Sequence, residues 1–407
     1  MIFIAVSGQN FIPANEFCND PNIKTILLNR SGWDLSMPVI YLGENEKLSL
    51  RFDCIGEQVE EYSYSLIACT YNWEINENPQ HFYLDGFNNT PVYDKYSSFN
   101  TSKYFTHFSA EIPGEDLSFL RSGNYILRVY ESRNPDSVIF TRRFCLAERF
   151  AEVSARVKKP NSQNQEIQIE IDLNDLNLIN PLAEIKVVII KNNDWNNIVP
   201  IAFKPLLHDN KLVLDIPCQV MAGGGNEFRY FDIKSIKYIS DRVDSIKYIS
   251  PETHFYLKPD IIKQFKPYFS STDLNGRFYI DMPEAHDRHL ESDYVYVHFT
   301  LEAPQPFGSD VYVYGALTYW KTDQNNFMIY NAERSVYEKI MLLKQGYYNY
   351  AYATKDYNNP KMNFDLTEGN HSETENDYLI FVYLKNPMSD FDRLVGFEII
   401  NSTEAER

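Results

Sequence analysis

The glycine run at Gly223–Gly225 is the first segment of this 407-residue chain whose residue types could do chemistry. Glycine-rich loops bind phosphate when a helix follows them, because the backbone N–H groups and the helix dipole then face the anion. Here Glu227–Asp232 follows, and its aromatic residues are typical of a strand. The pattern therefore predicts a turn between strands and no phosphate site.

The segment His286–His289 brings two imidazoles and a carboxylate together. Histidines at i and i+3 can bind zinc from a loop, but the sequence offers no identifiable third and fourth ligands. None of the eight histidines has a recognisable Ser or Cys partner, and no GxSxG motif occurs. Carboxylates are too numerous for one pair to stand out as a glycosidase dyad. The sequence predicts no enzyme, no cofactor and no metal site.

An acidic loop is a better candidate for binding. The segment Thr367–Asp377 contains Glu368, Glu373, Glu375 and Asp377 without any Lys or Arg. Two readings stay open, a solvated loop or an interaction arm at the polar rim of an interface. If the loop lies at a rim, neutralising all four acids together should slow association with a basic partner.

The net charge of the chain limits the classes of partner that it can bind. The chain has 38 basic and 56 acidic residues, which gives a formal charge of −18 at pH 7. Nucleic-acid binding needs clustered Lys and Arg, so this class of function is disfavoured, as is adsorption to anionic lipid. No apolar run of about 18 residues occurs, which predicts no direct membrane insertion. The five cysteines form no CxxC pair, and buried thiols are expected.

Strands must position these residues, because period-two alternation dominates the chain. The 30 Tyr and 27 Phe residues favour sheets, where flat rings pack on a pleated surface. Alternation is clear at Tyr62–Leu66, Tyr125–Tyr130, Ile167–Ile171 and Tyr294–Leu301. Clusters of Gly, Pro, Asn and Asp separate these runs. The sequence predicts an all-β protein of tandem β-sandwich domains.

Changes in pattern predict three sandwich domains. The expected boundaries are a signal-peptide remnant and N-terminal segment at 1–22, a first domain at 23–150, a second at 151–257, a linker at 258–293 and a third domain at 294–407. Ala5-Val6-Ser7 has the form of a signal-peptidase site, although a buried first strand is an alternative for Met1–Val6. Ser235–Ser240 recurs at Ser245–Ser250, which predicts a hairpin.

An ordered series of phrases resembles a known family. Tyr62–Trp73 is followed by Tyr83–Phe87, by Ser97–Thr101 and by Ser122–Tyr130, and Thr141–Phe144 closes the first unit. Gly225–Asp232 and Asp392–Phe397 continue the series. Together these phrases resemble the plug protein of the type IX secretion system of Bacteroidota.

The resemblance implies a non-enzymatic, periplasmic protein built from immunoglobulin-like β-sandwiches. Its implied partner is the outer-membrane β-barrel translocon, whose periplasmic mouth it would occupy. The association with the outer membrane would then run through that partner. The family supplies no catalytic residues to carry over.

The third predicted domain has a second resemblance, to the glycogen-binding type of carbohydrate module. Val311–Trp320 and Leu342–Tyr350 carry it, and Trp320 matches the tryptophan that stacks on sugar in that module. Ala351 stands in place of a sugar-contacting Lys, and Tyr357 is the nearest aromatic residue where a second stacking Trp is absent. The fold resemblance holds, and Trp320 is expected in the core or an interface. Glycan binding within a polysaccharide-utilisation system is the alternative function.

Overall fold

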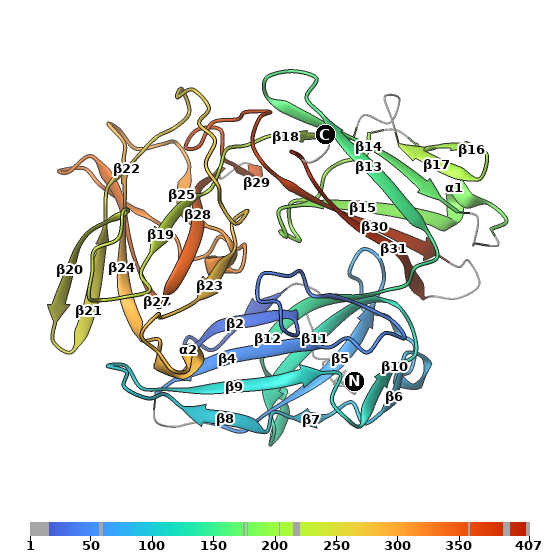
Figure 1. Ribbon diagram of the computed structural model, residues 1–407, viewed down its shortest axis with the longest axis horizontal. Helices are drawn as coiled ribbons and strands as arrows, with labels where there is room; N and C mark the ends of the chain where they lie inside the picture. Colours follow the sequence, from blue (N-terminus) through green and yellow to red (C-terminus); the bar gives the residue numbers. More distant parts are fainter. Residues whose placement is uncertain are drawn as a thin grey trace, which may run out of the picture. The chain divides into compact units, whose positions relative to one another are not determined.

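The computed structural model describes residues 16–56, 60–173, 176, 178–202, 204–214, 220–356, 359–385 and 391–403. Strands make up nearly all of the regular structure (Figure 1). The predicted all-β class with tandem sandwich domains is confirmed. The proposed signal-peptide site at Ala5-Val6-Ser7 lies outside the described residues.

The described residues divide into two compact units, and neither is continuous in sequence. The first unit comprises 16–95, 108–148 and 383–394, and the second comprises 96–107, 149–382 and 395–403. The sequence analysis expected three consecutive domains instead. Local alternation reports whether a segment is a strand but not which distant strand it joins, so segments exchanged between units leave no local signal.

The amino-terminal third of the chain supplies the strands of the first sandwich. They are β1 (Phe17–Cys18), β2 (Ile23–Arg30), β3 (Val39–Tyr41), β4 (Leu48–Ile55), β5 (Tyr62–Cys69), β6 (Leu84–Gly86), β7 (Thr90–Pro91), β8 (Asp94–Ser97), β9 (Phe105–Ile112), β10 (Leu117–Phe119), β11 (Gly123–Glu131) and β12 (Asn134–Ala147). One sheet has the order β12-β11-β5-β7, another has β2-β4-β9-β8, and β10 pairs with β6. All the neighbours along these paths whose register is given run antiparallel.

Aromatic rings fill the core of the first unit. Phe52 on β4 stacks on Phe108 on β9, with ring centroids 4.9 Å apart. Its other contacts are edge-on, to Tyr62 on β5 and to Phe140 on β12, at 5.5 and 5.1 Å. Because β4 and β5 belong to different sheets, these contacts join the two layers of the sandwich.

The rest of the chain supplies the strands of the second unit, two of which also reach the first. They are β13 (Glu152–Lys158), β14 (Asn164–Asp172), β15 (Ile185–Lys191), β16 (Leu206–His208), β17 (Lys211–Leu214), β18 (Met221–Gly223), β19 (Arg229–Asp232), β20 (Val243–Ile249), β21 (Glu252–Leu257), β22 (Asp260–Ile261), β23 (Phe278–Ile280), β24 (Tyr294–Glu302), β25 (Asp310–Tyr314), β26 (Ile329–Asn331), β27 (Val336–Lys344), β28 (Gly346–Asp356), β29 (Asn359–Asn363), β30 (Asp377–Lys385) and β31 (Asp392–Asn401). The main strand orders are β13-β14-β17-β16, β19-β28-β23 and β20-β21-β24-β27-β26.

Residues from β30 and β31 complete the first unit. Within that unit the Tyr383 hydroxyl donates to Asn124 Oδ1 over 2.8 Å. Arg393 Nη2 lies 2.8 Å from a carboxylate oxygen of Glu148. The first sandwich therefore includes residues that lie more than 200 positions beyond its predicted end at residue 150.

The strands around the predicted linker differ from expectation. β19 pairs with β28, and β21 pairs with β24, so strands of the predicted second domain share sheets with strands of the third. The segment 258–293 was expected to be a linker, but it contributes β22, β23 and the short helix α2 (Arg288–Glu291). Strands of two or three residues are too short to produce an alternation pattern, which explains the difference.

The predicted repeat hairpin is wrong. Ser235–Ser240 forms no strand, and β20 instead pairs with β21, from Val243 opposite Leu257 to Ile249 opposite Glu252. The remaining helical turns are α1 (Pro181–Glu184), η1 (Gln80–Phe82) and η2 (Ala316–Thr318). None of the helices in the described part of the chain has the length and apolar character needed to cross a membrane.

Candidate functional site

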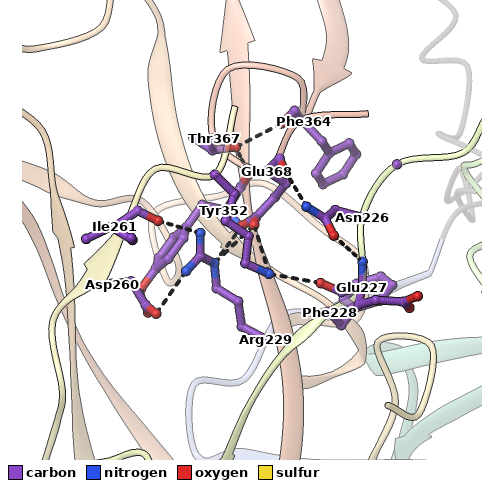
Figure 2. Close-up of polar contacts among 12 residues, drawn as sticks. Asn226, Glu227, Phe228, Arg229, Asp260, Ile261, Tyr352, Phe364, Thr367 and Glu368 are labelled. Atoms are coloured by element: carbon purple, nitrogen blue, oxygen red, sulfur yellow. Dashed lines mark hydrogen bonds and ion pairs between the residues drawn. The ribbon is translucent and has the colours of Figure 1, made fainter. Parts of the chain in front are cut away.

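The most concentrated chemistry in the described residues is a buried ion cluster around Arg229 in the second unit (Figure 2). Arg229 begins β19, and its side chain is only 6% exposed. Each nitrogen of its guanidinium donates to a protein group: Nη1 to Asp260 Oδ1 at 2.9 Å, Nε to Glu368 Oε1 at 2.9 Å, and Nη2 to the Ile261 carbonyl at 2.8 Å. The cluster therefore joins β19 to β22 and to the loop that holds Glu368.

Asp260 accepts hydrogen bonds through both carboxylate oxygens. Oδ1 accepts from Arg229 and from Arg242 Nη2, each at 2.9 Å. Oδ2 accepts from the hydroxyls of Tyr350 and Tyr352, at 2.6 and 2.8 Å. Both tyrosines point to this face because they are two residues apart on β28. A buried carboxylate is tolerated only with such full compensation.

Glu368 is held as firmly as Asp260. Besides Arg229, its Oε1 accepts from the backbone N–H of Tyr352 at 2.9 Å, and Lys263 Nζ lies 3.8 Å from Oε2. The Glu368 carbonyl accepts from Asn226 Nδ2 at 2.7 Å. The loop is thus tied to β28 and to the segment preceding β19 (Figure 2).

The electrostatics favour a charged cluster. Burial opposes the charge on Arg229, yet Glu368 and Asp260 together raise the pKa of its guanidinium above the ordinary value. Burial, followed by the charge of Asp260, raises the pKa of both Tyr350 and Tyr352. These tyrosines therefore stay protonated and act as hydrogen-bond donors. The cluster works as an electrostatic clamp between distant segments, since its donors and acceptors are engaged with one another.

The four predicted acidic residues do not form one surface. Glu368 is 3% exposed, so its predicted place on a solvated loop or interaction rim is wrong. Asp377 pairs with Arg277 at 3.3 Å, and Glu375 accepts from Asn401 at 2.9 Å. Glu373 is exposed. The partners of Glu368, Glu375 and Asp377 lie far away in sequence. Local composition therefore could not distinguish these acidic residues from the exposed one.

Trp320 is also enclosed. Its exposed fraction is 9%, and it packs edge-on against Tyr314 and Phe228, with ring centroids 5.5 and 6.2 Å away. Trp320 belongs to an apolar cluster with Tyr314 and Ala353. In this conformation it offers no open platform for a sugar ring, as expected for a core residue.

The glycine run proves to be a point of close backbone approach. A Cβ atom at Gly224 would lie 1.9 Å from the His371 carbonyl oxygen, so no other residue fits there. Lys191 Nζ donates to the carbonyls of Gly223 and Gly224 at 2.8 and 2.7 Å, and burial lowers its pKa to about 7. The loop presents carbonyls to a buried lysine, not N–H groups to an anion. The strand predicted after it is confirmed as β19.

The His286–His289 segment caps a helical turn. Asp287 accepts from the backbone N–H of His289 at 2.8 Å at the start of α2. No group of three or more His, Cys, Asp or Glu side chains that could hold a metal ion occurs within the described ranges.

Sequence reasoning missed Arg229 and Asp260. A usable signal existed for Arg229, because a single Arg stands between aromatic residues in Phe228-Arg229-Tyr230-Phe231, and an Arg at a core position needs buried partners. Nothing local identified Asp260 as that partner.

This architecture defines an all-β protein of tandem sandwiches whose second unit is fastened by buried ions. Residues 23–148 match the family described as type 9 secretion system plug protein 1st domain. The predicted resemblance to the plug family is thereby confirmed for residues 23–148, which make up most of the first sandwich. The match supports a role in type IX secretion and a location in the cell envelope.

A solved structure is similar to this chain over almost its whole length. The crystal structure of a hypothetical protein from Parabacteroides merdae is 29% identical in sequence and superimposes with a TM-score of 0.91. The alignment covers 95% of this chain and 98% of that chain. A search of the curated proteins found no match.

Proposed function

We propose that this protein is a non-enzymatic plug, which binds the periplasmic end of the outer-membrane β-barrel translocon of the type IX secretion system and occludes it. The observation that carries the proposal is the plug-family match of the first sandwich, residues 23–148. Two features that could have marked a catalytic or ligand-binding site, the Arg229 cluster and the glycine loop, have their polar groups engaged within the fold. An occluding protein needs a stable shape and an interface, and it needs no reactive group.

Co-purification tests the binding step. A tagged chain expressed in a bacterium with type IX secretion should recover one very large β-barrel protein from a detergent extract of the outer membrane. An unrelated periplasmic protein with the same tag is the matched control. Recovery of the tagged chain alone would contradict the proposal.

A conductance measurement tests occlusion. The purified barrel in a planar bilayer should pass ions, and addition of this chain to the periplasmic side should lower the open-channel current in proportion to occupancy. The control protein should leave the current unchanged. Binding without any fall in current would leave a non-plugging adaptor and contradict occlusion.

The glycan-binding alternative loses its main support. A sugar platform requires an exposed aromatic face, and Trp320 is enclosed by Tyr314 and Phe228. Calorimetric titration with glucans should therefore give no heat of binding. Saturable binding that disappears in Trp320→Ala, with the fold intact, would restore the alternative.

A further inference from the structure

A long irregular loop connects β22 to β23. Residues 262–277 form neither helix nor strand, apart from turns near residues 264 and 275. Loops longer than about 12–15 residues without their own secondary structure are uncommon in compact domains, and they are usually either functional or disordered. The contacts of this loop distinguish the two cases.

The first half of the loop is fastened to the buried part of the second unit. The Lys263 backbone N–H donates to the Thr367 carbonyl at 2.8 Å, and its Nζ donates to the Glu227 carbonyl at 3.2 Å. The Tyr268 hydroxyl donates to the Glu227 carboxylate. Glu227 is buried, with only 3% of its surface exposed. These bonds reach a buried group, which fixes the loop backbone.

The second half is fastened as well. Asp273 Oδ2 accepts from the Phe228 backbone N–H at 2.6 Å. Gly276 has φ +80°, and a Cβ there would lie 2.4 Å from Cη2 of Trp320, so only glycine allows this approach to the core. The loop is therefore an ordered connection with both halves anchored.

Between the anchors the loop holds two phenylalanines in solvent. Phe265 is 89% exposed and Phe269 is 80% exposed, while Tyr268 beside them turns inward to Glu227. Pro267 separates the two rings and limits the backbone freedom of the segment. Large aromatic side chains on a fixed backbone lose little conformational entropy when they are buried by a partner, which is the property of an interface anchor.

The charges near the rings favour a protein partner over a lipid surface. Lys266 lies between the two phenylalanines in sequence and is exposed, and Glu373 is exposed on the loop to which Tyr268 donates. Aromatic anchors within a polar, solvent-accessible rim are typical of protein interfaces. An anionic bilayer would attract a basic cluster, whereas this chain carries a net charge of −18.

We propose that Phe265 and Phe269 are the anchor residues of a protein-docking surface on the 262–277 loop, and that their partner is an apolar pocket on the translocon barrel. This inference rests on the proposed plug function, because that function supplies the partner. It goes further by assigning the contact to one loop of the second unit, outside the region that matches the plug first domain.

The test is binding of the full-length chain to the purified barrel, with the double variant Phe265→Ala/Phe269→Ala. Anchor residues of an interface typically change affinity by about 30-fold or more each, so the double variant should bind at least about 100-fold more weakly. Both rings are exposed, so the thermal midpoint should match that of the wild type. Phe87→Ala is the matched control, because Phe87 is a phenylalanine of similar exposure, 82%, in the first unit. It should bind within about threefold of the wild type.

The outcomes distinguish failure of this inference from failure of the plug function. If the wild-type chain binds and the double variant binds equally well, this inference fails and the plug function stands. If Phe87→Ala weakens binding as much as the double variant, the exposed rings contribute through non-specific hydrophobic association. The assignment to this loop then fails. If the wild type binds no barrel, both proposals fall. Equal binding to vesicles of outer-membrane phospholipid without the barrel would overturn the protein partner in favour of lipid.

Discussion

Two buried clusters, one in each unit, are held together by different forces. In the first unit Phe52, Phe108 and Phe140 are completely buried, and the ring of Phe52 contacts the rings of the other two. In the second unit Arg229 and Asp260 are also buried, but they meet as ions. A ring cluster is held by area removed from water and tolerates a change of shape. An ion cluster is tolerated only while every charge has its partner.

The difference predicts unequal responses to removal of one member. Ring contacts are individually weak and are shared among many atoms, so losing one leaves a smaller apolar core. Removing the cation from a buried pair leaves carboxylates without compensation in a low-dielectric interior. A single substitution in the ion cluster should therefore destabilise its unit more than a single substitution in the ring cluster.

The largest effect is expected for Arg229→Met, which keeps an unbranched side chain close in length to the aliphatic part of Arg and removes the charged guanidinium. The carboxylates of Asp260 and Glu368 would then lose their shared guanidinium. The remaining cations would be Arg242 beside Asp260 and Lys263 beside Glu368. Breaking a buried pair in this way costs about 3–5 kcal/mol. Urea unfolding followed by hydrogen exchange of peptides from each unit would measure it, and early exchange should appear in the second unit.

A triple-substitution control separates the charge from the packing. Arg229→Met combined with Asp260→Asn and Glu368→Gln removes all three charges at once, so it should recover part of the lost stability. If the triple variant is less stable than Arg229→Met by the sum of further losses, the cluster contributes through packing and not through charge balance.

A smaller effect is expected for Phe52→Leu in the first unit. Leu keeps an apolar side chain but leaves part of the ring volume empty between Phe108 and Phe140. Substitutions of this kind cost about 1–1.5 kcal/mol, well below the cost for Phe→Ala. The urea midpoint should shift equally at low and high salt, because no charge is involved. A salt-dependent shift would contradict the purely apolar description of this core.

The sequence could predict the rings of the first core but not the ions of the second. Tyr62 and Phe140 lie in runs whose strand character the sequence makes visible, and burial of such residues needs no knowledge of their partners. Arg229 meets Glu368 across 139 positions and Asp260 across 31. From the sequence alone, Glu368 therefore could not be distinguished from the other acidic residues of its loop. The plug resemblance was accessible because ordered phrases persist in the chain even where contacts cannot be deduced.

A pH dependence should also distinguish the units, with a smaller effect than either substitution. In the second unit His254 Nδ1 and His298 Nε2 share one hydrogen bond of 2.9 Å, between neighbouring strands β21 and β24. Burial, and then the charge of His254, lowers the pKa of His298 below its ordinary value of 6.5. The unfolded chain therefore takes up this proton more readily than the folded one.

Stability from His298 is consequently complete above the ordinary pKa and is lost as pH falls toward the lower pKa of the folded state. The surrounding charges are Glu252, Lys103 and Lys247 with Glu338, and they are of mixed sign. Thermal melts between pH 7.5 and 5 should show a midpoint that falls with acid, and His298→Gln should flatten that fall. An equal slope in the variant would exclude the histidine pair as its source.

The smallest effect is expected for Glu373→Gln, and it tests the separation of the acidic loop into buried and exposed members. Glu373 is exposed, so neutralising it should change the free energy of unfolding by less than about 0.5 kcal/mol. Glu368→Gln is the matched substitution on the same loop, and it removes a buried charge opposite Arg229, at a cost of about 2–3 kcal/mol. A variant that neutralises all four acids together would confuse the two roles, because lost association would follow from a weakened fold. Urea midpoints of the two single variants separate them. Equal midpoints would mean that Glu368 is as solvated as Glu373, and the clamp around Arg229 would lose its physical basis.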